Sequence, residues 1–259
     1  MQNKFNNENN KEIPYIEVNG LPLASLIVLS FNRPDYLHRT IASLKRWTTY
    51  PAEIIVVDDG SYEKENVKFL LKLYEAKEIS CLILNPGHNQ GVGASINKGF
   101  HCAHGKYLFK LDSDLEYKPY WLEKSVAIME TFPEIGVLGL FHYWYDPCDY
   151  RKMFIRNETR DGLIIERHQK QVGSTMVFNR GIYEKFGDLV EGSYAYGADF
   201  CYKENLRQHG YWTVLPTEDL VRNYGFGEPY TSLLYKGKKV KISKKPLIFG
   251  MKGRKKWEQ

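Results

Sequence analysis

The stretch KYLFKLDSDLEY, residues 106–117, changes abruptly from an apolar run to two carboxylates, Asp112 and Asp114. The apolar part is typical of a buried strand, and the acids follow where that strand should end. Two like charges this close repel each other, so solvent, helix N-terminal amides or a cation should offset them. The stretch therefore predicts a strand whose carboxyl end carries a concentrated negative charge.

Short apolar runs alternate with amphipathic stretches on both sides of this strand. Further strands are predicted at residues 24–31, 53–60, 79–85 and 135–141, with helices from Pro34, after Ser61, and at about 92–104 and 120–132. This alternation predicts an α/β fold with a mostly parallel central sheet and helices on both faces. Ligands bind such sheets beyond the carboxyl ends of the strands, where Asp58, Asp59 and the Asp112–Asp114 pair all fall.

The pattern changes after Phe141. MFIRNETRDGLIIERHQ predicts a hairpin around Arg160-Asp161-Gly162, and ADFCYKENLRQHGYWTVLP predicts a helix ended by Gly210 and then a strand. A smaller antiparallel region should therefore follow the parallel one. We expect one domain over residues 21–235, after a disordered leader at 1–20 and before a basic tail at 236–259.

The composition fits a folded cytoplasmic protein. Of 259 residues, 43% are hydrophobic and 14% aromatic, which is enough to build a core. No apolar run approaches the roughly 18 residues of a membrane span, and the first residues lack the apolar segment of a signal peptide. The four cysteines form no C-x-x-C pair and are predicted to be reduced thiols.

The charge is uneven along the chain. Residues 236–259 contain ten Lys and Arg and one Glu, so the rest carries about −4 of the net +5. Such a basic tail could bind an anionic partner, namely the inner face of a membrane, a phosphorylated glycan or a nucleic acid. It could equally be a solvated segment that aids solubility. Nucleic acid is disfavoured because the body contains no recognised binding motif.

Three strand-end elements could carry chemistry. The Asp112-Ser113-Asp114 turn could hold Mg²⁺ or Mn²⁺ beside a diphosphate, or be an acidic loop in which Asp114 caps the next segment. VVDDGS (56–61) offers Asp59 to a nucleobase or ribose, or is a turn with Ser61 as a helix N-cap. NQGVGASINKG (89–99) would let a ligand approach the backbone at Gly91 and a helix N-terminus, but matches no nucleotide fingerprint.

Taken in order, these elements resemble the family 2 glycosyltransferases of the GT-A fold. The resemblance runs from ASLIVLSFNRPDYLHRTIASL through AEIIVVDDGS, NQGVGASINKG and KYLFKLDSD to GSTMVFNRGIYEKFGDLVE and YGADFCYKENLRQHGY, covering residues 24 to about 225. It implies a nucleotide-sugar half at 24–141 and an acceptor half at 142–230. It also implies sugar transfer from a nucleotide-sugar donor to an acceptor hydroxyl, usually with inversion and with a divalent cation.

The resemblance also assigns roles to residues. Phe31 takes the aromatic place near the nucleobase, Asp59 the base or ribose acid, and Asn97 a place in the Gly-rich element with Gly91. Asp114 is expected to contact Mn²⁺ or Mg²⁺ directly, with Asp112 toward the ribose or a metal-bound water. The cation would stabilise the leaving nucleoside diphosphate.

The chain departs from the family pattern in two places. The family's E-D-x-D element, which supplies the general base, is here Gly197-Ala198-Asp199-Phe200-Cys201, so Asp199 is the candidate base or a helix N-cap, with Glu191 in reserve. The family often places a metal-binding His where this chain has Arg222. A guanidinium cannot bind a cation but pairs well with phosphate, so Arg222 is expected to bind the donor.

The acceptor side is less determined. Trp144 and Tyr145 could stack on a sugar or pack in the core. The acceptor could be a glycan, a lipid-linked molecule or a protein. The leading hypothesis is an inverting, metal-dependent enzyme that uses a UDP-sugar. The alternatives are a dTDP- or GDP-sugar transferase and a catalytically inactive sugar-nucleotide-binding module tethered by its basic tail.

Overall fold

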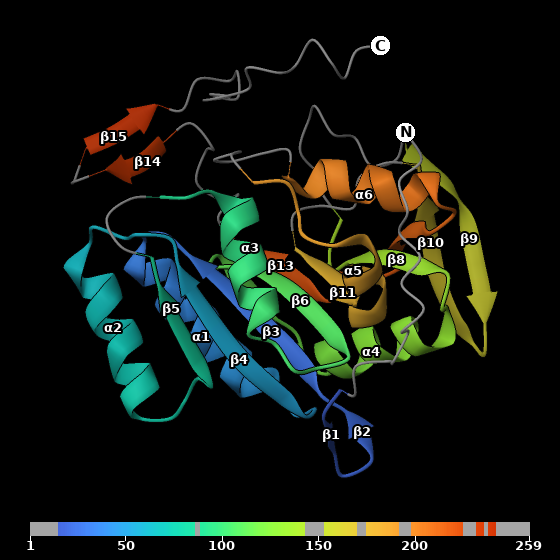
Figure 1. The fold of residues 1–259 in the computed structure, drawn as a ribbon, viewed down its shortest axis with the longest axis horizontal. Helices are drawn as coiled ribbons and strands as arrows, with labels where there is room; N and C mark the ends of the chain where they lie inside the picture. The colour runs from blue at the N-terminus through green and yellow to red at the C-terminus, as the bar shows by residue number, and fades with distance from the viewer. Residues whose placement is uncertain are drawn as a thin grey trace, which may run out of the picture.

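A nine-stranded sheet, in the order β5-β4-β3-β6-β11-β8-β12-β10-β9, forms the centre of the computed structural model (Figure 1). The structure describes residues 15–85, 89–142, 153–169, 175–191, 198–224, 232–235 and 238–241. The strands are β3 (Ala24–Ser30), β4 (Ala52–Asp58), β5 (Cys81–Leu84), β6 (Tyr107–Asp112), β8 (Ile135–Gly139), β9 (Phe154–Arg160), β10 (Leu163–His168), β11 (Met176–Asn179) and β12 (Trp212–Pro216). All except β10 and β11 run in the same direction, which confirms the predicted mostly parallel sheet.

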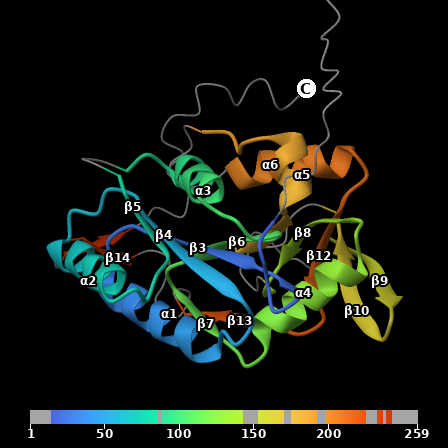
Figure 2. The ribbon, with the colours of Figure 1, turned by 60° about the horizontal axis from the view of Figure 1, so that its bottom comes forward.

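Helices cover both faces of the sheet (Figure 2). One face carries α1 (Pro34–Trp47), α2 (Lys64–Glu75) and α4 (Trp121–Thr131), and the other carries α3 (Val92–His101), α5 (Arg180–Phe186) and α6 (Ala198–Gln208). Strand β3 shows the cause, because Leu26 and Val28 belong to the first apolar cluster and Ile27 to the second. Successive strand side chains point to opposite faces, so an all-apolar strand needs a helical layer on each side.

Strand β11 is where the sheet differs from a simple alternating fold. It lies between β6 and β8 and runs antiparallel to both, with Val177 paired to Phe109 and to Leu138. Its position among the other strands depends on contacts between distant segments. Its insertion places the residue before it, Thr175, beside the end of β6.

The antiparallel region is the predicted hairpin of β9 and β10, joined to the sheet through β12. Its turn residues Asp161 and Gly162 have φ of 50° and 78°, and left-handed backbone at both positions is typical of a two-residue hairpin turn. A separate pair, β7 (Leu115–Tyr117) with β13 (Val221–Asn223), brings the chain after β12 back beside the end of β6.

The remaining described strands lie toward the two ends of the chain. They are β1 (Glu17–Val18) with β2 (Leu21–Pro22), and β14 (Ser232–Tyr235) with β15 (Lys238–Lys241). Strand β1 falls within the predicted leader and β15 within the predicted tail; the rest of the tail and residues 1–14 lie outside the described residues. Within the described part, no helix is long and apolar enough to cross a bilayer.

Candidate active site

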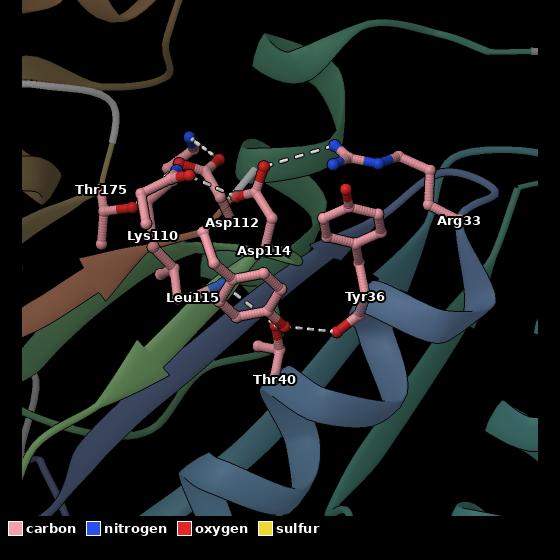
Figure 3. Close-up of polar contacts among 10 residues, drawn as sticks. Arg33, Tyr36, Thr40, Lys110, Asp112, Asp114, Leu115 and Thr175 are labelled. Carbon is pink, nitrogen blue, oxygen red and sulfur yellow. Dashed lines mark hydrogen bonds and ion pairs between the residues drawn. The ribbon is translucent and has the colours of Figure 1, made fainter. Parts of the chain in front are cut away.

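Asp112, the last residue of β6, and Asp114 lie at the carboxyl edge of the sheet (Figure 3). The Asp112 side chain is bound on both oxygens. Its Oδ1 accepts a hydrogen bond from Lys110 Nζ, and its Oδ2 accepts one from Thr175 Oγ1 over 2.9 Å. The Lys110 side chain is only 4% exposed, so this cation is fixed in place within the sheet layer.

The Asp114 side chain is 14% exposed and is bound by two residues from distant segments. Asn223 Nδ2 donates to its Oδ1 over 3.1 Å, and Arg33 Nη1 lies 3.3 Å from its Oδ2. The backbone N–H of Tyr224 also donates to the Asp114 carbonyl oxygen over 3.1 Å. The segment that directly follows Asp114 is the strand β7 and not a helix, so Asp114 is not a helix N-cap.

The electrostatic balance at Asp114 is unfavourable to its charged form. Burial, and then the nearby Asp112 carboxylate, raise the pKa of Asp114 above its ordinary value, while Arg33 and Lys110 partly oppose the rise. A carboxyl group with a raised pKa holds negative charge at a cost. A cation added beside Asp114 would remove that cost.

A strained loop between β3 and α1 aims Arg33 at this pair. Asn32 and Arg33 have φ of 53° and 61°, a left-handed conformation that costs about 1 kcal/mol or more for each residue with a side chain. The loop is held by Asn32, whose Oδ1 accepts the backbone N–H groups of Tyr62 and Glu63, each over 3.1 Å. Phe31 lies at the same edge, 38% exposed, with its ring edge-to-face against Tyr62 at 6.1 Å.

An aromatic stack joins α1 to the segment after β13. The Tyr36 and Tyr224 rings are stacked at 5.5 Å, and the Arg33 guanidinium lies 4.0 Å from the Tyr36 ring centre. Tyr224 Oη donates to the Tyr36 carbonyl over 2.8 Å and lies 2.9 Å from Thr40 Oγ1. These contacts fix both segments that bind Asp114.

The two acids at the end of β4, Asp58 and Asp59, have different partners. Asp58 is 2% exposed and accepts hydrogen bonds from Ser30, Ser61 and Asn66, so it holds β3, β4 and α2 together. Helix α2 begins at Lys64 with Glu63 at the N-cap, so the alternative in which Ser61 is the helix N-cap does not hold. The Ser61 hydroxyl is bound to Asp58 instead, and Asn32 satisfies the N–H groups before the helix.

Asp59 binds the Gly-rich loop. Its Oδ1 accepts from Asn85 Nδ2 over 3.0 Å and from the Gln90 N–H over 2.9 Å, and its Oδ2 accepts from the Gly91 N–H over 3.0 Å. Gly91 has φ of 94° and is the N-cap of α3. The loop expected to approach a ligand is therefore attached to the acid expected to bind the nucleoside.

Asn97 connects the two halves of the molecule. It is buried on α3, and its side chain exchanges two 2.9 Å hydrogen bonds with the backbone of Leu189. Its Nδ2 also donates to Glu191 Oε1 over 3.1 Å. Glu191, the reserve candidate for the base, is thus held near α3.

The side chain of Arg222 does not lie on the side of β13 that faces Asp114, although its position in the sequence suggests a place at the metal site. It is exposed on β13, whereas its neighbours Val221 and Asn223 point to the other side, as strand alternation requires. Asn223 is the residue that binds Asp114. The spacing from Pro216 in the sequence indicates which segment comes near the site. It does not indicate which side chain of β13 faces the carboxylates.

Three predicted site residues have side chains outside the described part of the structure. Trp144 and Tyr145 lie outside the described residues. Asp199 lies in the first turn of α6, and its side chain is outside the described part.

Four residues at the site were not identified from the sequence, namely Arg33, Lys110, Thr175 and Asn223. A signal existed for two of them. Lys110 is a charged residue inside an apolar strand, two positions before Asp112, so both point to the same face. Arg33 sits directly before the helix-starting Pro34. For Thr175 and Asn223, only the three-dimensional pairing of β11 and β13 supplies the information.

Known glycosyltransferases are similar to this chain in sequence. The model of the family "Glycosyl transferase family 2" matches residues 25–187. An uncharacterized glycosyltransferase of Haemophilus influenzae is 26% identical over 242 residues, which cover 86% of this chain and 72% of the relative.

Solved structures share the fold at low sequence identity. The structure of GalNAc-T7 with UDP, GalNAc and Mn²⁺ matches with a TM-score of 0.61 at 16% identity, covering 76% of this chain and 42% of that protein. The mannosyltransferase PcManGT of Pyrobaculum calidifontis, in complex with GDP-Man and Mn²⁺, matches with a TM-score of 0.58 at 17% identity, covering 81% and 59%. The chain thus spans about half the length of these two proteins, and its fold is of the GT-A type.

Proposed function

The chain belongs to glycosyl transferase family 2 and is a transferase enzyme, and we propose that it moves a sugar from a nucleoside-diphosphate donor to an acceptor hydroxyl with inversion at the anomeric carbon. The observation that carries this proposal is the half-buried Asp112–Asp114 pair at the carboxyl edge of the sheet, where Asp59 and Phe31 also lie. A UDP-sugar is the first donor to test. GDP- and dTDP-sugars are the alternatives, since the two similar structures hold UDP and GDP-Man.

The residues present fit a divalent cation at Asp114. The raised pKa of this carboxyl group, caused by burial and by Asp112, marks an excess of negative charge that a cation would relieve. Among the described residues no three His, Cys, Asp or Glu side chains form a metal-binding group. The diphosphate and water would supply further oxygen ligands to a cation at Asp114. Mn²⁺ or Mg²⁺ suits such oxygen ligands, and both similar structures contain Mn²⁺. When bound, the cation would stabilise negative charge on the leaving diphosphate.

The protein residues have distinct roles in this proposal. Phe31 offers its exposed ring to the nucleobase, and Asp59 with Gly91 and Asn97 shapes the nucleoside side of the site. Asp199 removes the proton of the acceptor hydroxyl as its oxygen attacks the anomeric carbon. The bond from that carbon to the diphosphate oxygen breaks, and the nucleoside diphosphate leaves with the bonding electrons. Glu191 is the second candidate for the base.

The acceptor is a glycan, a lipid-linked molecule or a protein, with Trp144 and Tyr145 as candidate contacts. The basic segment 236–259, with ten Lys and Arg against one Glu, is proposed to contact an anionic membrane surface. Removal of residues 236–259 should abolish binding to vesicles rich in anionic lipid and leave nucleotide binding intact.

Nucleotide binding and turnover together test the proposal. Thermal unfolding is measured with UDP, GDP and dTDP, each with and without Mn²⁺, and one nucleotide should raise the melting temperature only when Mn²⁺ is present. The matching nucleotide sugar should be hydrolysed slowly, and Asp199→Asn and Asp114→Asn should abolish this hydrolysis. No shift with any nucleotide would refute the donor site. A shift without hydrolysis would favour the inactive binding module.

A further inference from the structure

We propose that Arg33 is an internal counter-ion of the cation site. In the absence of donor it occupies Oδ2 of Asp114, and when a divalent cation takes that oxygen it turns to the diphosphate of the donor. This inference rests on the proposed function and goes beyond it, because it names the residue that couples cation binding to donor binding. It also explains why the loop before α1 tolerates backbone strain.

The hydrogen bonds at the site single out one oxygen. Oδ1 of Asp114 is bound by Asn223, and both oxygens of Asp112 are bound by Lys110 and Thr175. Among the residues that the structure describes, only Arg33 binds Oδ2 of Asp114. An incoming cation can therefore reach Asp114 by displacing a single partner.

Arg33 is the cation of the site that can move. Its side chain is 31% exposed, whereas that of Lys110 is 4% exposed. It makes a single contact of 3.3 Å with Asp114 and leaves the rest of its planar fork of donors unused there. A monodentate, partly exposed ion pair is weak, so a divalent cation should displace it readily.

The surroundings of Arg33 keep it close after displacement. Its guanidinium lies 4.0 Å from the centre of the Tyr36 ring, and this cation–π contact holds the side chain at the carboxyl edge of the sheet. The left-handed backbone at Asn32 and Arg33 is fixed by the bonds from Asn32 to the start of α2. A guanidinium held there can donate two parallel hydrogen bonds to a phosphate, which a cation-bound diphosphate would present.

Two changes in affinity, in opposite directions, test the proposal. Isothermal titration of the apo protein with Mn²⁺ alone should show that Arg33→Ala binds Mn²⁺ about two- to fivefold more tightly, since a competing surface ion pair is removed. Titration with UDP and with GDP in saturating Mn²⁺ should show that the same variant binds the preferred nucleotide about tenfold or more weakly. Arg33→Lys should lie between the wild type and Arg33→Ala in both titrations.

Arg46→Ala is the matched control. Arg46 lies in the last turn of α1, whereas Arg33 is the N-cap of the same helix, so the variant removes the same charge roughly 20 Å away along the helix axis, beyond the screening length at physiological salt. Both affinities should be unchanged in this variant. Circular dichroism melting of each variant in the absence of ligand confirms that the fold is retained.

The contrary outcomes are distinct. If Arg33→Ala weakens Mn²⁺ binding as well as nucleotide binding, Arg33 only positions Asp114, and the counter-ion role is overturned. If Arg33→Ala leaves the affinities for Mn²⁺ and for the nucleotide unchanged, the counter-ion role is also overturned. The proposed function still stands in that case, because the wild type binds both ligands. If the wild type binds neither Mn²⁺ nor any of UDP, GDP and dTDP, the donor and metal proposals fail and this inference fails with them.

Discussion

Asn97 and Leu189 are joined by two hydrogen bonds of 2.9 Å, one in each direction between the Asn97 amide and the Leu189 backbone. The two residues are 92 positions apart, the first on α3 and the second just after α5. Asn97 is buried, so no water can replace these bonds cheaply. This contact connects the Gly-rich element to the segment that leads to Glu191.

Asn97→Ala should lower the free energy of unfolding by about 2 kcal/mol, because the Leu189 N–H and carbonyl groups lose their partner in a buried position. Urea denaturation measures the change. Glu191→Ala removes only the more exposed of the Asn97 partners and should cost less than half as much. An equal loss in both variants would show that the Leu189 contact is not the main contribution.

Gly99→Ala should destabilise the fold by about 1–3 kcal/mol through overpacking. A Cβ at this position would lie 2.4 Å from Ile27 Cγ2 and 3.3 Å from Val57 Cγ2, so α3 could not approach β3 and β4 as closely. The cost should shrink when Ile27→Ala is already present, since that substitution removes the nearest clashing atoms. A double-mutant cycle measured by denaturation checks this, and purely additive effects would contradict it.

Asp114→Asn should destabilise the ligand-free protein little at pH 7, because it removes a charge that burial and Asp112 disfavour. Burial and Asp112 raise the folded-state pKa of Asp114, so the folded protein holds this proton more tightly than the unfolded chain does. Wild-type stability from this group is therefore greatest at low pH and is lost as pH rises from the unfolded pKa, 3.8, through the folded value.

The variant should lose that pH dependence and also lose Mn²⁺ binding. Thermal melting of both proteins between pH 4 and 8 follows the difference. A variant that melts well below the wild type at pH 7 would show that Asp114 is a structural residue.

Asn223→Ala should weaken nucleotide binding in Mn²⁺ by about tenfold, because Oδ1 of Asp114 loses its donor and the carboxylate can rotate. Arg222→Ala changes the adjacent residue, which faces the other side of β13, and should have little effect. Titration with the preferred nucleotide compares the two. If Arg222 instead binds the donor, as the sequence suggests, Arg222→Ala should weaken donor binding more than Arg222→Lys does.

Most strands and helices could be predicted because the signals for them are local. The apolar run of β3 extends over both faces, Pro34 starts α1, and Asp161-Gly162 forms the turn of β9 and β10. Secondary structure follows from the spacing of apolar residues and from the backbone preferences of Pro and Gly. The alternative of an N-cap at Ser61 does not hold, because Asn32, from another loop, accepts the backbone N–H groups of Tyr62 and Glu63.

The sequence alone thus determined the α/β class, the mostly parallel sheet and the placing of Asp58, Asp59, Asp112 and Asp114 at strand ends. These are consequences of periodicity along a single stretch of chain. Only the tertiary structure decided which side chains bind those acids. Arg33 and Asn223 meet Asp114 from 81 and 109 positions away, and β11 brings Thr175 to Asp112 from 63 positions away. Such contacts depend on strand order and on which side of a strand faces the site, and these are set by packing between distant segments.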